Sequence, residues 1–510
     1  MFQITTRLAR AGRHKVAAGL LAVALLAVGT VSHAASYALT ITAPQAGLTT
    51  ANRYYRAYPG LQYDVPVAAV GGKYPYTYAL TSAPSGMTVN ATTGEINWPS
   101  PPAASSPYSV TAKVTDSAGA STQVTWSVTV TTGGFIFLDA VNGKTAAQGG
   151  NGSIGNPFKN IVDWYITKYD TTYANYFVYY KSGTYTTASA PMENGNRLAV
   201  VNSKPVVWLA YPGATPVIDT TASYICIYGA PSNTYFEGLS IQNFTTDFGV
   251  RIDSEGNNVV FRNNNFSNLP ASAGGIGTNA AALMIADGGA VGNRWVILNN
   301  KFSAITGIGY ALLGYATNLT LVDSNTITGF GSPQNIAIGP KDSNTMWFIR
   351  NNRINITQGV GVWIDTYTVQ QTNANFEISY NLVQVGSGYG FWLGQQSGAY
   401  GPVTDFRNTY VGAPVRVDNL SSSNGPVSFS NDVIVASSGS ATPQATAGLL
   451  SLVANLSGNT STGIVDGSGN LTGSYTKYLG VDGYQLLGGS STSPPTTAVV
   501  PNPPTSVIVD

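Results

Sequence analysis

The stretch VVFRNNNF (residues 259–266) decides the fold, because it recurs in altered form through the second half of the chain. Its later versions are WVILNNKF (295–302), LTLVDSNTI (319–327), WFIRNNRI (347–354), FEISYNLV (376–383), TDFRNTYV (404–411) and VSFSNDVI (427–434). One asparagine keeps its place in every version: Asn264, Asn300, Asn325, Asn352, Asn381, Asn408 and Asn431. These asparagines are 23 to 29 residues apart, except for one interval of 36 residues.

A repeat of about 26 residues that contains only short apolar strands cannot enclose a core alone, so each coil must stack on the next. We therefore expect an all-β chain whose main body is a right-handed parallel β-helix, a solenoid of these coils. We interpret the asparagines as a structural ladder, because each amide can bond to the next while its residue tolerates a left-handed bend. A ligand-binding row is the alternative, but an apolar residue follows two places after every member. A leucine-rich-repeat solenoid has similar periods, yet the leucine spacing that it requires is absent.

Residues 36–132 have a different pattern, with short alternating strands expected at 76–80, 109–115 and 124–130. Strands of this length, separated by turn residues, predict a β-sandwich. The segments PYTYALTSAPSGMTVNATTGEINWPS (75–100) and YSVTAKVTDSAGASTQVTWSVTV (108–130) resemble the immunoglobulin-like (Ig-like) modules of bacterial surface proteins. The resemblance implies a spacer or a weak binding unit and indicates no particular chemistry.

The solenoid is expected at residues 134–488. Its opening, FIFLDAVNGKTAAQGGNGSIGNPFKNIVDW (135–164), resembles the start of bacterial β-helix proteins of the pectate-lyase-like superfamily. We expect Asn156 and Pro157 to begin a short helix that covers the open end of the stacked core. Its apolar face would contain Phe158, Ile161, Val162 and Trp164. Residues 489–510 have the Ser/Thr/Pro-rich composition of a linker, or are the start of a truncated module.

The first residues are typical of an export signal, because four basic residues precede an apolar run at 16–31. We predict a signal peptide at residues 1–34 and therefore a secreted or cell-surface bacterial protein. No later segment is apolar enough over sufficient length to span a membrane, so we expect no transmembrane segment in the mature chain. The only cysteine, Cys226, excludes an intrachain disulfide.

Cleavage of the signal peptide also removes both histidines of the chain, His14 and His33. The mature chain then has 20 Lys and Arg against 23 Asp and Glu, and this balance favours no nucleic-acid partner. Without histidine, the mature chain has no Ser-His-Asp triad, no histidine-bound zinc and no histidine general base. The Gly-His-Gly motif and the Asp-Asp pair of polygalacturonases are absent as well.

A second column of residues precedes the asparagine phrase in each coil. Strand alternation separates this column into two faces. If the core-facing residues are Ile252, Ile285, Leu313, Ile338, Ile364, Leu393 and Val417, then the outward residues are Arg251, Met284, Leu312, Ala337, Trp363, Trp392 and Arg416. Coils stack about 4.8 Å apart, so Trp363 and Trp392 are expected side by side, where indole rings suit sugar rings. Arg262, Asp323 and Arg350 form another outward column, which we interpret as an interstrand charge ladder.

Polar side chains at the strand ends form the candidate catalytic site, for which we name Lys341, Asp342 and Asp365. The pectate-lyase-like resemblance implies that acidic residues here bind calcium, which makes Asp342 and Asp365 candidate ligands, while a basic residue removes a proton beside a uronate carboxylate. Trp363-Ile364-Asp365 is similar to a pectate-lyase phrase, but Thr366 stands where that family has histidine. The candidate substrate-binding residues are Trp363, Trp392, Tyr367, Gln395 and Arg416.

Two functions follow from these residues. The first is a secreted β-helix protein that interacts with a polysaccharide or cell-surface glycan, as a polysaccharide lyase or glycoside hydrolase acting on a long chain. The second is a non-catalytic adhesin or structural stalk, which the low content of charged residues, 9%, and the incomplete catalytic motifs favour.

Overall fold

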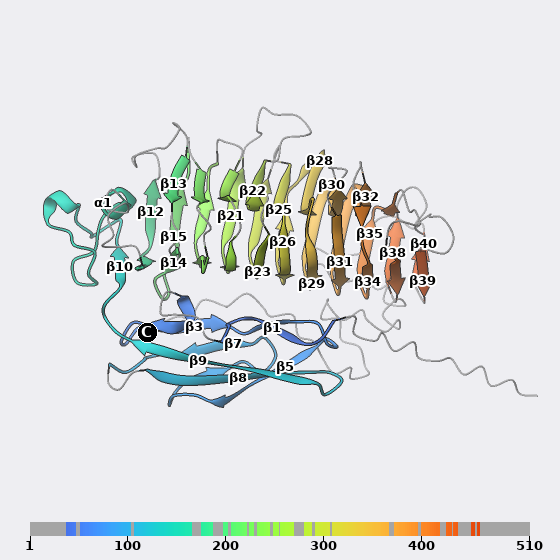
Figure 1. Cartoon of the computed structure of the whole chain (residues 1–510). Helices are drawn as coiled ribbons and strands as arrows, with labels where there is room; N and C mark the ends of the chain where they lie inside the picture. The colour runs from blue at the N-terminus through green and yellow to red at the C-terminus, as the bar shows by residue number, and fades with distance from the viewer. Residues whose placement is uncertain are drawn as a thin grey trace, which may run out of the picture.

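The structure, a computed structural model, contains a small β-sandwich module alongside a long parallel β-helix (Figure 1). It describes residues 37–46, 52–103, 107–165, 175–186, 197–201, 206–221, 224–228, 232–244, 248–253, 256–269, 280–287, 291–305, 309–366, 372–395, 399–418, 425–430, 432–436, 450–453 and 456–458. The predicted signal peptide, most of residues 437–488 and the linker at 489–510 lie outside these ranges.

The module is a β-sandwich, as its alternating strands predict, and its inward side chains form one core. Its strands are β1 (Thr40–Ala43), β2 (Arg56–Ala57), β3 (Tyr63–Pro66), β4 (Ala68–Val70), β5 (Tyr76–Ser82), β6 (Thr88–Val89), β7 (Glu95–Trp98), β8 (Tyr108–Asp116) and β9 (Ser121–Val130), with the 3-10 helix η1 (Arg53–Tyr55) before β2. One sheet has the order β2-β9-β8-β5, a second has the order β3-β7-β6, and β1 pairs with β4.

In the described ranges, the β-helix has a first parallel sheet of 13 strands, with one strand per coil except where β33 and β34 both pair with β31. These strands are β10 (Phe135–Leu138), β11 (Phe177–Tyr180), β14 (Val207–Ala210), β17 (Tyr235–Glu237), β20 (Asn257–Arg262), β23 (Gly292–Leu298), β26 (Thr317–Asp323), β29 (Thr345–Arg350), β31 (Thr372–Ser379), β33 (Ala399–Tyr400), β34 (Val403–Phe406), β37 (Val427–Ser430) and β39 (Leu450–Val453). We call this sheet the module-side sheet, because the module lies along it (Figure 1).

The second parallel sheet has 18 strands and lies on the other side of the core; we call it the outer sheet. These strands are β12 (Gly183–Thr186), β13 (Arg197–Val201), β15 (Pro216–Asp219), β16 (Tyr224–Tyr228), β18 (Ser240–Gln242), β19 (Phe248–Asp253), β21 (Asn265–Leu269), β22 (Ala281–Asp287), β24 (Lys301–Ile305), β25 (Tyr310–Gly314), β27 (Thr326–Thr328), β28 (Gly331–Pro340), β30 (Arg353–Thr366), β32 (Leu382–Gln395), β35 (Thr409–Gly412), β36 (Val415–Val417), β38 (Val433–Ala436) and β40 (Leu456–Gly458).

The core between the two sheets is a stack of side chains from equivalent positions in successive coils. Phe266 and Phe302, one coil apart, have ring centroids 4.8 Å apart and nearly parallel planes. The first coil is covered by α1 (Ile161–Tyr165), which follows the 3-10 helix η2 (Ala146–Gln148). Phe158, Ile161 and Trp164 join the core as expected, but the helix begins at Ile161 rather than at Pro157. Phe158 instead bridges to strand β10, which delays the helix.

The asparagine ladder is confirmed from Asn264 through Asn408. Each backbone N–H and each side-chain Nδ2 donates to Oδ1 of the next asparagine, at distances of 2.8 to 3.1 Å. The same Nδ2 atoms also donate to strand carbonyls, as from Asn352 to Val322 O at 2.9 Å. All six asparagines are buried. Their amides therefore provide the hydrogen bonds that water would otherwise make to the polar groups at each bend.

Two details of the ladder differ from the sequence prediction. Asn431 lies outside the described residues, and Asp432 occupies the next rung, where it accepts the Asn408 N–H at 2.7 Å. The register pairs Tyr410 with Ile434, so the apolar spacing predicted this rung one residue early. The left-handed bend also falls one residue before each ladder asparagine, at residues with φ of 53° to 59°: Asn263, Asn299, Ser324, Asn351, Tyr380 and Arg407.

The ladder ends among buried carboxyl groups. Asp405 accepts from Asn408 Nδ2 at 2.8 Å and from the Tyr410 hydroxyl at 2.6 Å, next to Asp432. Burial raises the pKa of both Asp405 and Asp432 above the usual range of a carboxyl group. The last described ladder rung therefore depends on ionisable groups, whereas the earlier rungs depend on amides.

The module is attached to the β-helix through a shared apolar core. Outward side chains of the module-side sheet belong to the same buried cluster as the module core: Val207, Leu209, Tyr235, Val260, Val296, Leu321 and Phe348. Strand β1 crosses β23, and Tyr37 packs edge-on against Phe348 at 5.4 Å. This packing fixes the module along the side of the rod rather than at its end (Figure 1).

Two buried arginines strengthen this attachment. Arg350 bonds through Nε to Asp323 at 2.7 Å, and its two terminal nitrogens donate to the Tyr76 hydroxyl and to Ala69 O on the module. Arg262 forms ion pairs with Glu237 of the β-helix at 2.6 Å and with Glu95 of the module at 2.5 Å. The column that we interpreted as an interstrand charge ladder therefore forms two interstrand ion pairs, Glu237 with Arg262 and Asp323 with Arg350, and also binds the module.

Replacing Asn352 by alanine removes an acceptor for Asn325 and two donors inside the core. We expect the free energy of unfolding to fall by about 2–4 kcal/mol, because several buried polar groups lose their partners. Urea unfolding followed by circular dichroism measures this change. Asn355→Ala, at an exposed position nearby, is the control and should change stability by less than about 0.5 kcal/mol. If both variants lost the same free energy of unfolding, the asparagine ladder would not contribute specially to stability.

Candidate functional site on the outer sheet

The structure places Trp363, Trp392 and Arg416 at equivalent positions of three successive strands of the outer sheet. They project outward because Ile364, Leu393 and Val417, one residue later, belong to the core. The indole rings of Trp363 and Trp392 are stacked, with centroids 4.7 Å apart and planes 7° apart. Residues 24 to 29 positions apart in sequence thus form one continuous row, which we call the tryptophan row.

Arg416 extends the tryptophan row by one more layer. Its guanidinium carbon lies 4.8 Å from the Trp392 ring centroid, and its Nε bonds to Asp418 at 2.9 Å. Asp418 also accepts the Trp392 Nε1–H at 2.8 Å, and Arg416 donates to the Tyr389 hydroxyl at 2.8 Å. Because the coils are stacked in order, Trp363 and Arg416 lie on opposite faces of Trp392. Trp392 therefore presents its edge to a ligand, whereas sequence reasoning expected its face.

The tryptophan row is part of a longer outward column, in which Arg251 lies between Cys226 and Met284 and is also only partly buried. Earlier members of the column, Cys226, Met284 and Leu313, are fully buried, whereas Trp363 and Trp392 are half-buried and the Arg416 side chain is 40% exposed. Sequence reasoning placed Leu312 and Ala337 in this column, but both lie in the core. Leu313 is the outward residue instead, because two adjacent leucines give no indication of which one faces inward.

The predicted catalytic residues lie at the carboxyl ends of neighbouring strands. Lys341 forms a backbone bridge with Asp365, and the Asp342 N–H donates to Asp365 O at 3.1 Å. The Asp365 side chain is buried, with the residue 2% exposed, and neither carboxyl oxygen accepts a hydrogen bond from the described residues. Burial raises the pKa of Asp365 to about 6, against the opposing effect of the Lys341 charge. The structure thus brings the three residues together.

Gly394 allows the tryptophan row and Asp365 to approach each other. Gly394 is the partner of Asp365 on the adjacent strand. A β-carbon at this glycine would lie 2.9 Å from Trp392 Nε1 and 3.0 Å from Trp363 Nε1, so a larger residue would displace the rings. Trp363 Nε1 donates to no acceptor in the part of the chain that the structure describes. An unsatisfied N–H donor and an unsatisfied carboxyl group are therefore neighbouring outward residues of strand β30, and a hydroxyl group suits both.

Two of the predicted substrate-binding side chains lie outside the described part of the chain. Tyr367 lies outside the described residues, and Gln395 is the last residue of β32, with a side chain outside them. Sequence reasoning did not find Tyr389 or Gly394 in the site. The glycine-rich segment GSGYGFWLG (386–394) could have indicated them, because glycine within a strand often marks a place where another group packs close to the backbone.

Calcium is a poor match to the candidate ligands. Calcium takes six to eight oxygen ligands, whereas only Asp342 and Asp365 provide carboxylates here, next to the positive charge of Lys341. In the described part of the chain, no group of three or more His, Cys, Asp or Glu residues could hold a metal ion. We therefore assign no catalytic step to calcium.

Comparison with known proteins supports the reading of the module. Residues 40–131 match the family model described as "Putative Ig domain". The N-terminal module is Ig-like. Within the described ranges, no helix is sufficiently long and apolar to cross a membrane. A comparison with curated protein sequences finds no significant match.

Three solved structures show distant similarity to the chain. A rhamnogalacturonan lyase is 15% identical with a TM-score of 0.35, over 59% of this chain and 74% of that chain. The periplasmic alginate epimerase AlgG is 10% identical with a TM-score of 0.31, over 55% and 77%. A family 28 exopolygalacturonase of Yersinia enterocolitica is 10% identical with a TM-score of 0.35, over 78% and 97%. Similarity at this level transfers no activity to this chain.

The raised pKa of Asp365 makes stability depend on pH. Its folded-state pKa of about 6 exceeds the ordinary value of 3.8, so the folded chain holds this proton more tightly. As pH rises from about 4 to above 6, the residue should therefore remove up to about 3 kcal/mol from the free energy of unfolding.

Asp365→Asn tests this pH dependence, because asparagine has a similar shape and does not ionise. The variant should be more stable than the native chain by about 2–3 kcal/mol at pH 7.5 and similar to it at pH 4. Urea unfolding at both pH values measures the difference. If the difference in the free energy of unfolding between the variant and the native chain stayed constant from pH 4 to pH 8, the pKa of Asp365 would not be raised by burial.

Proposed function

We propose that the chain binds a long glycan across its coils at the tryptophan row. The observation that carries this proposal is the accessible row of Trp363, Trp392 and Arg416 on the sheet that the Ig-like module leaves uncovered (Figure 1). Three equivalent positions, one per coil, suit a polymer whose sugar units repeat in one direction. The exposed edges of the stacked indoles offer apolar contact to the C–H groups of sugars. Arg416 can donate hydrogen bonds to hydroxyl or carboxylate groups, and Asp418 can accept them from hydroxyl groups.

A buried carboxyl group suited to proton transfer lies beside the tryptophan row, so we extend the proposal to a lyase or hydrolase. A carboxyl group with a pKa near 6 can donate or accept a proton close to neutral pH, and Asp365 has this property. Lys341 and Asp342 lie beside it as the further catalytic candidates. The chain would meet such a polymer outside the cell, where the predicted signal peptide directs it.

The double variant Trp363→Ala with Trp392→Ala tests glycan binding. We expect affinity for polygalacturonate, alginate or a neutral polysaccharide bound by the native chain to fall at least tenfold, equivalent to about 1.4 kcal/mol. Affinity electrophoresis and calorimetry measure the loss. Tyr211→Ala, which removes a half-buried aromatic ring next to the module-side sheet, is the matched control and should retain binding. Retained binding by the double variant would reject the tryptophan row.

Turnover separates an enzyme from a binding protein. Reducing-end and unsaturated-product assays on the bound glycan, with and without calcium, should show activity that Asp365→Asn abolishes. Binding at the tryptophan row without any turnover would leave the non-catalytic adhesin as the function. Such a protein would use the β-helix as a rigid rod that carries the row.

A further inference from the structure

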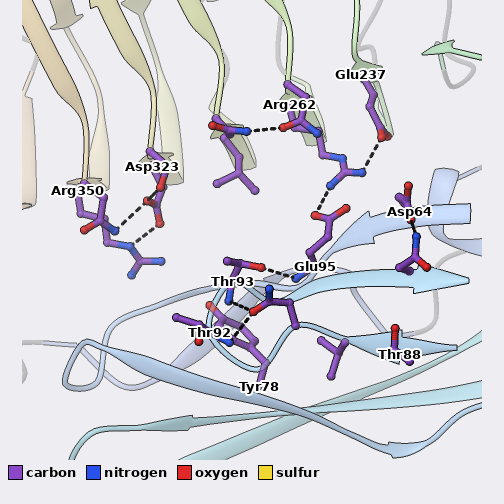
Figure 2. A pocket seen from close by; sticks show the side chains of 18 of the residues that line it. Asp64, Tyr78, Thr88, Thr92, Thr93, Glu95, Glu237, Arg262, Asp323 and Arg350 are labelled. Atoms are coloured by element: carbon purple, nitrogen blue, oxygen red, sulfur yellow. Dashed lines mark hydrogen bonds and ion pairs between the residues drawn. The ribbon is translucent and has the colours of Figure 1, made fainter. Parts of the chain in front are cut away.

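A cleft of about 760 Å³ separates the Ig-like module from the β-helix, between the contacts made by Arg262 and Arg350 (Figure 2). Its floor consists of the bends between the module-side and outer sheets, where Asn263, Asn299 and Ser324 lie in successive coils. Its opposite wall consists of module strands β6 and β7 and the turn that joins them. The volume is in the range of ordinary ligand sites. The cleft lies on the module side of the rod, away from the tryptophan row.

The floor of the cleft presents amide groups in a row. Asn299 Nδ2 donates to Asn263 Oδ1 at 2.8 Å, and this leaves Asn263 Nδ2 and Asn299 Oδ1 without hydrogen bonds among the described residues. The module wall offers Asn97 and Gln62, whose amide nitrogens both donate to Asp64 at 2.6 Å. Donors and acceptors thus alternate on both sides of the cleft, which matches a ligand with several hydroxyl groups.

The charges in the cleft disfavour an anion. Four carboxyl groups line it, from Asp64, Glu95, Glu237 and Asp323, against two arginines. Both arginines already form ion pairs within the protein, at 2.5 to 2.7 Å. Both oxygens of Asp64 accept hydrogen bonds from amide nitrogens, as those of a carboxylate do, although burial raises the pKa of this group to about 6. A uronate or a phosphate would therefore meet repulsion without a free cation to bind it.

The cleft also has apolar surface, from Tyr78 and Val89 on the module and from Leu298 at the end of strand β23. Sugar rings need both surfaces, apolar contact for their C–H faces and hydrogen bonds for their hydroxyl groups. We propose that the cleft between the Ig-like module and the β-helix binds a neutral oligosaccharide. This site is separate from the tryptophan row and would allow one chain to hold two glycan segments.

The test uses the full chain and six hexasaccharide probes. Four are neutral, from cellulose, amylose, xylan and mannan, and two are acidic, from polygalacturonate and alginate. With the tryptophan row removed by Trp363→Ala and Trp392→Ala, calorimetry at pH 7.5 should show saturable binding of at least one neutral probe, with one site per chain, and weaker binding of the acidic probes. Thr88→Trp fills the cleft from an exposed position of strand β6 and should lower affinity at least tenfold. Leu298→Ala, which removes apolar surface, should lower it several-fold.

Two controls isolate the cleft. Thr125→Trp makes the same change at an exposed position of strand β9, outside the cleft, and should leave affinity unchanged. The Trp363→Ala, Trp392→Ala variant should also keep binding in the cleft. A wrong proposal for the cleft can therefore be distinguished from a wrong proposal for the tryptophan row. Each variant is compared with the native chain by thermal unfolding. In the Trp363→Ala, Trp392→Ala variant, binding of none of the neutral probes, or tighter binding of the acidic probes, would overturn the proposal. Unchanged binding after the further change Thr88→Trp would overturn it as well.

Discussion

The alignment of each coil on the next is the constraint on which the rest of the structure depends. Parallel strands set the spacing between coils, and the buried asparagine amides fix the rotation of each coil, because a rung shifted by one residue would lose its acceptor. This alignment turns residues 24 to 29 positions apart in sequence into neighbours. It creates the Trp363–Trp392 stack, the Asp323–Arg350 ion pair and the Lys341–Asp365 bridge.

The fold could be predicted from sequence because this constraint is periodic. Asparagine at one bend and apolar residues at fixed distances from it identify the coils without any knowledge of their contacts. The prediction fails where the local pattern is ambiguous by one residue. Leu312 and Leu313 are chemically alike, and Asn431 stands next to Asp432, whose carboxyl oxygen serves the same hydrogen bond. Alternation identifies the strands, but only the pairing with neighbouring coils selects the register.

The candidate site was predictable only in part, for a different reason. Alternation was sufficient to bring Trp363 and Trp392 together, but their exposed surface depends on what covers them. The position of the Ig-like module depends on contacts such as Arg350 with Ala69 and Tyr76, which are more than 270 residues apart in sequence. No periodic pattern links these residues. No sequence pattern therefore predicts the cleft between the two domains, because its lining residues are brought together only by the docking of the module.

The ladder also gives the solenoid two chemically different ends. Amide rungs have no proton to lose, so rising pH leaves the hydrogen bonds of these rungs intact. The final described rung ends on Asp405 and Asp432, whose ionisation inside the core opposes folding because burial raises their pKa. Rising pH would then weaken the ladder first at this rung, toward the C-terminal side of the described coils. The coil that carries Arg416 lies next to this rung, so the weakening would reach the tryptophan row before it reached the module.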